Sequence, residues 1–260
     1  MASAIDRMNR IPGGLPALTF LIILVIWEVS TRVLQIPSFL LPAPSRIVEG
    51  FDGITVARWA GHVWSTFRVA MTGYLTAIAV SLPLAIMLTR YKTVSSSIYP
   101  LLVVIQSTPI VAVAPIIVVT LGSGDLSRVL ITFLISFFPL VVSMTTGLKA
   151  TPEELIELSH SLRAPLIREF TQIRIPFAIP YIFSGLKISV TLSVIGAVVA
   201  EFVAAEKGIG YFIQFSTSLF KIPQAWAGLA ILVLMSLTLF QLISFIQRRF
   251  FPWSLPRETK

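Results

Sequence analysis

Residues 129–148 read VLITFLISFFPLVVSMTTGL and contain no charged side chain in twenty positions. A helix of twenty apolar residues is about 30 Å long, which matches the hydrocarbon core of a bilayer. A strand of this length would be unusual, and a single strand in lipid would leave its backbone groups without hydrogen-bond partners. The segment therefore predicts a membrane-spanning α-helix.

Five other charge-poor runs predict further spans, so that 129–148 becomes the fourth of six. They cover about residues 15–34, 69–88, 98–121, 177–203 and 223–246. The 260-residue chain is 55% hydrophobic and 12% charged, about half the charged share of a typical soluble domain. The sequence predicts an all-α, polytopic membrane protein with six transmembrane helices in a single domain, residues 15–250, and no room for a large soluble domain.

Charge distribution predicts how the spans are oriented. The first run follows Arg7 and Arg10, as in a signal peptide, but no small-residue cleavage site follows it, so a retained span is expected. With both termini inside, the predicted cytoplasmic segments hold twelve of the twenty basic residues and the outer segments hold seven. The positive-inside rule therefore favours a cytoplasmic N-terminal segment, 1–14, and a cytoplasmic tail, 251–260.

Several functional classes are disfavoured by composition. The net charge of +8 is explained by basic residues that flank membrane spans, so we expect no nucleic-acid partner. Cysteine is absent, which excludes thiol chemistry in this chain. The two histidines, His62 and His160, have no carboxylate at metal-ligand spacing, and no nucleophile–base arrangement emerges. We expect neither a metal site nor an enzyme.

The loop at residues 149–176 has the most soluble character in the chain. Thr151, Pro152 and Glu154 are typical of a helix start, at the N-cap, N1 and N3 positions of a capping box. An amphipathic helix is predicted at about 152–162, with an apolar face that carries Leu155, Leu158 and Leu162.

The rest of this loop predicts a break and a second helix. Arg163-Ala164-Pro165 ends the first helix, the second extends to about Ile173, and Pro176 begins the entry to the fifth span. Periodicity alone leaves two interpretations of the first helix open. It either lies on the membrane surface or docks to a cytoplasmic partner.

The same loop resembles the signature of permease subunits of ATP-binding-cassette importers. That signature is Glu-Ala-Ala, three residues, Gly, nine residues, Ile, one residue and Leu-Pro. The register fits without a gap from Glu157, with Leu158, Ser159, Arg163, Ile173, Ile175 and Pro176 at the later positions. Arg163 occupies the Gly position; if the family's turn is left-handed there, Arg costs about 1 kcal/mol or more.

Flanking motifs extend the resemblance over about residues 15–250. They are similar to the nitrate/sulfonate/taurine branch of type I importers, and comprise Leu40–Ser45, Pro109 and Pro115 with Gly122–Gly124, Phe137–Pro139, Val199–Phe202 and Lys207–Tyr211. The resemblance implies a permease in a bacterial inner membrane, with a cytoplasmic coupling helix between the fourth and fifth spans. The residues it assigns to the ATPase-coupling loop are Glu154, Leu155, Glu157, Leu158, Ser159, Leu162, Arg163, Ala164, Ile173 and Pro176.

The resemblance also implies partners. Members form permease dimers, here expected to be homodimers, and receive solute from a periplasmic or lipid-anchored binding protein. A separate ATPase subunit drives transport. The chain has no Gly-rich phosphate-loop motif, so we expect no cofactor here and place ATP and Mg on the ATPase chains. Membrane lipid surrounds the spans. The expected solute is a nitrate-, sulfonate- or taurine-like anion or a vitamin precursor.

Charged residues within or near spans are further candidates. Glu28 and Arg32 are four residues apart and predict a local ion pair. Lys187 either extends to the cytoplasmic interface or lines the pathway. In the family, the segment around Glu201, Gly208 and Gly210 borders the outer gate, so these residues are candidates for the gate or pathway. The alternative for Glu201 is an ordinary pairing or an interfacial position, and the two glycines predict a turn. The alternatives to an importer are a secondary transporter or channel without an ATPase, and a membrane enzyme.

Overall fold

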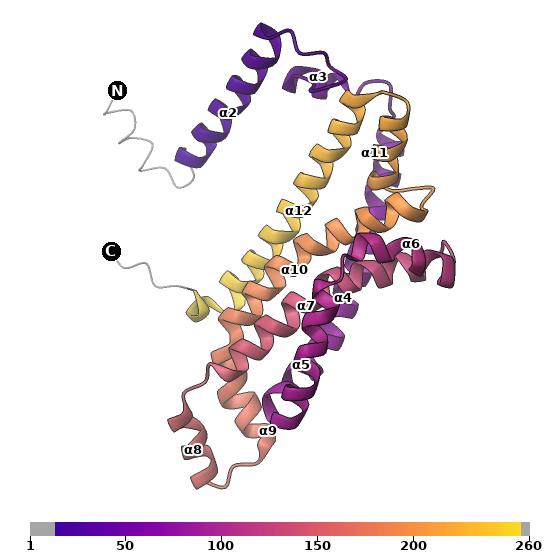
Figure 1. Ribbon diagram of the computed structural model, residues 1–260. Coiled ribbons are helices and arrows are strands. Elements are labelled where there is room, and N and C mark those ends of the chain that lie inside the picture. Colours follow the sequence, from indigo (N-terminus) through magenta and orange to yellow (C-terminus); the bar gives the residue numbers. More distant parts are fainter. Residues whose placement is uncertain (1–13, 256–260) are drawn as a thin grey trace, which may run out of the picture. The chain divides into compact units, whose positions relative to one another are not determined.

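The computed structural model describes residues 14–255, and every regular element in that range is a helix (Figure 1). The all-α class is therefore confirmed. The expected N-terminal segment 1–14, apart from Gly14, and residues 256–260 of the expected tail lie outside the described residues.

Five helices of the described chain are long and apolar enough to cross a bilayer. They are α2 (Gly14–Val33), α4 (Val56–Arg90), α7 (Asp125–Lys149), α10 (Ile175–Ala204) and α12 (Ile222–Phe250). Shorter helices connect them: α3 (Pro44–Glu49), α8 (Glu153–Ser161), α9 (Leu166–Arg168), the π-helix η1 (Glu169–Arg174), α11 (Ile209–Ser218) and the 3₁₀-helix η2 (Pro252–Ser254).

The predicted third span, 98–121, is not one straight helix. It forms α5 (Lys92–Ser107) and α6 (Ile110–Leu121), which are bent by 93°. Thr108 is extended, with φ −77° and ψ 125°, because the following Pro109 disfavours helical geometry in the residue before it. The pair makes either a broken span or a re-entrant segment. The expected number of six spans is therefore reached only if the two helices are counted as one span.

Four of the other helices are longer than the charge-poor runs that predicted them, whereas α2 has the predicted length. α4 begins at Val56, well before the predicted residue 69, because charged side chains in its first turns do not interrupt the backbone. Pro83, Pro139 and Pro180 lie inside α4, α7 and α10 without ending them. Spans tolerate proline because neighbouring groups can satisfy the freed carbonyls.

The chain divides into two compact units, where the sequence predicted one domain over 15–250. The first contains the described residues up to Arg58 and Phe212–Ala230; the second contains Trp59–Tyr211 and the residues from Ile231 onward. In α2 the one buried residue is Thr31, so this apolar helix packs little against the rest of its unit. Hydropathy marks such a helix as a span but carries no information on what it packs against.

The core of the second unit lies between α7 and α10, which run side by side in Figure 1. Its buried residues include Leu88, Phe137, Leu140, Met144, Leu148 and Ala178. The two helices approach closely at Gly196, where an added Cβ would lie 2.8 Å from the Cα of Thr132. Small residues at such crossings are the usual means of close packing in membranes.

Candidate functional site

The start of α8 differs from the predicted capping box. Pro152 is the N-cap residue, with φ −53° and ψ 136°, and no side chain caps the helix. The Thr151 hydroxyl instead donates to the carbonyl of Leu148, 3.3 Å away. The prediction of Thr151 as N-cap is therefore wrong, because its side chain turns back to satisfy the end of α7. Glu153 and Glu154 still place negative charge at the positive end of the helix dipole.

The end of α8 is a Schellman turn centred on Arg163. The Arg163 amide donates to the His160 carbonyl at 2.9 Å, and the Ala164 amide donates to the Ser159 carbonyl at 3.0 Å. Arg163 has φ 53°, in the left-handed region. The position that is Gly in the importer signature therefore has the conformation that favours Gly, and an Arg there costs about 1 kcal/mol.

Arg163→Gly is expected to stabilise this turn by about 1 kcal/mol, because it removes the left-handed strain. In hydrogen exchange on the purified protein, the Ala164 amide should then exchange about fivefold more slowly. As the control, Arg168→Gly removes the same charge from a helical position and should not slow exchange. Faster exchange in Arg163→Gly than in the wild type would contradict the assignment.

The predicted apolar face of α8 is divided between two environments. Leu155 is half-buried, whereas Leu158 and Leu162 are 55% and 72% exposed. Glu157 is also exposed, and Ser159 is buried. In α9, Leu166 and Ile167 are exposed as well. We call Leu158, Leu162, Leu166 and Ile167 the loop apolar set. Figure 1 shows α8 and α9 beyond the end of α7.

A buried carboxylate, missed by the sequence interpretation, holds this loop in place. Glu169 is 3% exposed; its Oε1 accepts from Arg174 Nε at 2.7 Å, and its Oε2 lies 3.2 Å from His160 Nε2. Arg174 also donates to the Leu148 carbonyl at 3.3 Å. Glu169 thus joins α8 to η1, and Arg174 joins η1 to the end of α7.

The spacing of Glu169 and Arg174 explains why they were missed. They are five positions apart, whereas residues in contact on an α-helix are three or four positions apart. They pair within η1, where the π-helical geometry brings residues five apart together. Ile173 and Pro176 of the signature lie in η1 and the first turn of α10, so the second predicted loop helix continues into the fifth span.

A second site surrounds Glu201, which is 1% exposed. Its Oε2 accepts from Thr66 Oγ1 at 3.0 Å and from the Gly210 amide at 2.7 Å. The Ile209 amide donates to Thr66 Oγ1 at 2.8 Å, and the Gly208 amide donates to His62 Nδ1 at 3.2 Å. We call these residues the Glu201 cluster. Side chains from α4 and α10 thus satisfy the first backbone amides of α11, as a cap does.

Both glycines of the predicted turn belong to this cluster. Gly208 has φ 131°, and a Cβ there would lie 2.2 Å from the Cδ of Glu201. A Cβ at Gly210 would lie 2.9 Å from Glu201 Oε2. The structure therefore brings three of the four predicted pathway or gate residues together. Lys187 is separate, since it lies fourteen residues earlier on α10, or about 21 Å along the helix.

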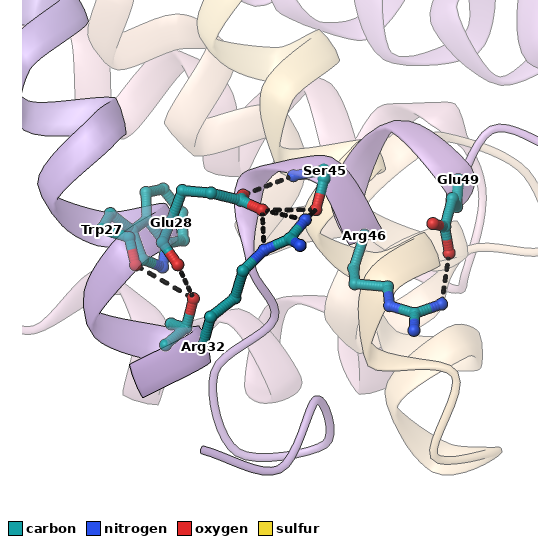
Figure 2. A network of polar contacts seen from close by, with 7 residues as sticks. Trp27, Glu28, Arg32, Ser45, Arg46 and Glu49 are labelled. Atoms are coloured by element: carbon teal, nitrogen blue, oxygen red, sulfur yellow. Dashed lines mark hydrogen bonds and ion pairs between the residues drawn. The ribbon is translucent and has the colours of Figure 1, made fainter. Parts of the chain in front are cut away.

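In the first unit, Glu28 joins α2 to α3 (Figure 2). Its Oε1 accepts from Arg32 Nε at 2.6 Å and from Ser45 Oγ at 2.8 Å, and its Oε2 accepts from the Ser45 amide at 3.0 Å. The predicted Glu28–Arg32 ion pair is confirmed. The additional partner, Ser45, lies in the first turn of α3. The serine of the Leu40–Ser45 motif therefore helps to hold α3 against α2.

Comparison with known proteins identifies the family. Residues 81–254 match the family described as binding-protein-dependent transport system inner membrane components, which is more than half of the chain. The chain belongs to this family. It is therefore an inner-membrane permease of the importer type, and the alternatives without an ATPase are no longer favoured.

Named relatives cover most of this permease. It is 34% identical to the formylaminopyrimidine transport permease protein ThiX of Halalkalibacterium halodurans, over 92% of this chain and 95% of the relative. It is 32% identical to the riboflavin transport system permease protein RibX of Chloroflexus aurantiacus, over 92% and 90%. The taurine transport system permease protein TauC of Escherichia coli is 27% identical, over 87% and 84%.

A solved structure supports the fold of the permease. A chain of the MetNI methionine ABC transporter, in an inward-facing conformation, aligns with a TM-score of 0.59. The alignment covers 83% of this permease and 99% of that chain at 19% identity. The resemblance in fold thus includes most of the described helices, although the sequences have diverged widely.

Proposed function

We propose that this permease forms the solute pathway of an ATP-binding-cassette importer and is driven by a separate ATPase that binds α8. The observation that carries the proposal is an exposed pair of leucines outside the bundle: Leu158 lies on α8 and Leu162 is the C-cap residue of that helix. An amphipathic helix with exposed leucines is the usual ligand of an apolar groove. Glu157, beside them, is available to pair with a basic group of the ATPase.

The contacts that hold this loop favour the interpretation that α8 docks to a partner over the interpretation that it lies on the membrane surface. The Schellman turn fixes the end of α8, and Glu169 and Arg174 tie the loop to the end of α7. From Leu166 to Ala204 the chain is helical without a break. A displacement of the loop by the ATPase would therefore be transmitted along α10 to the Glu201 cluster.

We assign the Glu201 cluster to the outer gate of this pathway. Its hydrogen bonds connect α4, α10 and the start of α11, so these helices move together while the cluster is intact. Gly208 and Gly210 permit the close approach that the cluster needs.

The remaining partners follow from the same proposal. ATP and Mg bind to the ATPase chains, since this sequence has no phosphate-loop motif. A second copy of the permease completes the pathway, and a binding protein delivers the solute at the outer face. Both termini and α8 lie on the cytoplasmic side, in agreement with the distribution of basic residues.

For the solute we propose a vitamin precursor first and a taurine-like sulfonate second. The relatives above 30% identity carry names that refer to formylaminopyrimidine and riboflavin transport, and the taurine permease is more distant. Calorimetric titration of the cognate binding protein with these compounds distinguishes the two classes. Micromolar binding of taurine without binding of the pyrimidine or flavin would reverse the order.

Glu157→Ala tests the coupling role directly. The variant should insert normally, since Glu157 is exposed, but solute-stimulated ATP hydrolysis in reconstituted vesicles should fall about tenfold. Glu153→Ala is the matched control, because it removes the same charge from the first turn of the same helix. Stimulated hydrolysis at the wild-type level in Glu157→Ala would remove Glu157 from the proposed interface.

A further inference from the structure

Two buried polar atoms of opposite charge, on α7 and α10, lack a hydrogen-bond partner. Arg128 Nε and Glu201 Oε1 are both inaccessible to solvent, and neither makes a hydrogen bond within residues 14–255. The Arg128 side chain is 15% exposed, and its Nη2 contacts Asp125 Oδ1 at 2.6 Å. Since a guanidinium group carries five N–H donors, Arg128 has the capacity to bind a second carboxylate through its Nε. Unpartnered buried atoms are rare in folded proteins.

Helices α7 and α10 run antiparallel in a register that two glycines define. A Cβ at Gly185 would lie 2.7 Å from the Cβ of Ser143, and a Cβ at Gly196 would lie 2.8 Å from the Cα of Thr132. Between these two crossings the contact moves eleven residues forward on α10 and eleven residues back on α7. Each step toward the end of α10 is therefore matched by one step toward the start of α7.

The same register brings Arg128 level with Glu201. Arg128 lies four residues before Thr132 on α7, and Glu201 lies five residues after Gly196 on α10. Arg128 also lines a cavity of about 630 Å³ together with Ala204, which follows Glu201 by three residues. The charge of Arg128 acts on the Glu201 carboxylate, in agreement with this placement. The two unpartnered atoms thus belong to neighbouring side chains.

Opening of the proposed gate removes a hydrogen bond from Glu201. Its Oε2 accepts from the Gly210 amide at 2.7 Å, and Gly210 belongs to α11. This bond is lost when α11 separates from α10. A buried carboxylate that loses a donor is strongly destabilised unless another donor takes its place. Arg128 Nε is such a donor at the same level of the helix pair.

We propose that Arg128 exchanges partners when the gate opens, leaving Asp125 and pairing with Glu201. The inference rests on the assignment of the Glu201 cluster to the outer gate. Asp125 keeps a second cation, because its Oδ2 accepts from Arg68 Nη2, and it is itself half-exposed. Neither carboxylate is then left without a cation. Arg128 is therefore a positioning residue that stabilises the open gate.

Hydrogen exchange of the Gly210 amide measures the state of the gate, because Glu201 binds this amide in the closed arrangement. The complete importer in nanodiscs is compared without nucleotide and with a non-hydrolysable ATP analogue. In the wild type the analogue should accelerate exchange about tenfold, whereas in Arg128→Gln the amide should stay protected. Arg68→Gln, which removes an equal charge from beside Asp125, is the matched control and should open as the wild type does.

Two further variants separate pairing from a structural role. In a Glu201→Gln background, Arg128→Gln should leave gate opening unchanged, since a neutral side chain at position 201 needs no cation. Asp125→Asn should act in the opposite direction, because it releases Arg128 toward Glu201. Without nucleotide, its Gly210 amide should exchange about threefold faster than in the wild type. Asp125→Asn also provides the test if Arg128→Gln does not assemble.

Opening of Arg128→Gln to the wild-type extent would overturn the exchange but leave the gate in place, since water would then satisfy Glu201. A Glu201→Gln protein whose gate still requires Arg128 would overturn it as well, because Arg128 would then support the fold. Equal exchange of the wild-type Gly210 amide in both nucleotide states would remove the gate assignment, and the exchange of partners with it.

Discussion

Gly208→Ala is expected to disrupt the Glu201 cluster and to abolish transport. The added Cβ would lie 2.2 Å from the Cδ of a buried carboxylate, and alanine is strained at φ 131°. Backbone strain of about 1–3 kcal/mol and overpacking of about 1–3 kcal/mol then add. The start of α11 would lose its cap from Thr66 and Glu201. Thermal unfolding of the purified permease and solute uptake in vesicles measure the two consequences.

The matched control is Gly61→Ala, also in the second unit. Nothing lies within 4 Å of a Cβ at Gly61, which is an exposed position inside α4. Alanine in a helix is favoured over glycine by about 1 kcal/mol, so this variant should be at least as stable as the wild type. A Gly208→Ala protein with wild-type Tm and wild-type uptake would show that the cluster is neither tight nor needed.

Leu158→Asp combined with Leu162→Asp is expected to release the ATPase and leave the permease folded. Both side chains are mostly exposed, so the permease itself loses little. In the proposed complex each leucine contributes about 1.5–3 kcal/mol of burial, and a carboxylate placed in the same groove adds a desolvation cost. Co-purification of the ATPase should fall more than a hundredfold, and ATP-driven uptake should be lost.

Leu126→Asp is the control for this double substitution. Leu126 is 66% exposed and lies in the first turn of α7, at the opposite end of that helix from the α8 loop. It should keep wild-type amounts of bound ATPase. Full recovery of the ATPase with the Leu158 and Leu162 double variant would mean that the loop apolar set is not the docking surface.

Sequence patterns predicted the helices better than their interruptions. Long charge-free runs located the helices that became α7 and α12, because few soluble structures tolerate twenty apolar residues in succession. Nothing in the sequence singled out Pro109 as the proline that ends a helix, since Pro83, Pro139 and Pro180 lie in similar runs and do not end theirs. Tertiary packing decides whether a proline kinks or ends a helix, and a single sequence does not contain it.

In the candidate sites, too, features that depend on a short stretch of sequence were predicted, and contacts between residues far apart in the sequence were not. The signature aligned Arg163 with its Gly position, and the structure has φ 53° there, a conformation that favours Gly. Contacts across long separations had no local signal: Thr66 is 135 residues from Glu201, and Lys187 is 60 residues from Gln247. These partners come from three-dimensional packing and became visible only in the fold.

The central claim, that α8 is the surface on which a separate ATPase acts, is tested most directly by site-specific cross-linking. The chain has no cysteine, so Leu158→Cys introduces its only thiol, to which a benzophenone group can be attached. On illumination of the assembled importer, the account predicts a covalent adduct between permease and ATPase from Leu158→Cys and none from Leu126→Cys. An intact importer that gives no adduct from Leu158→Cys, or equal adducts from both positions, would contradict it.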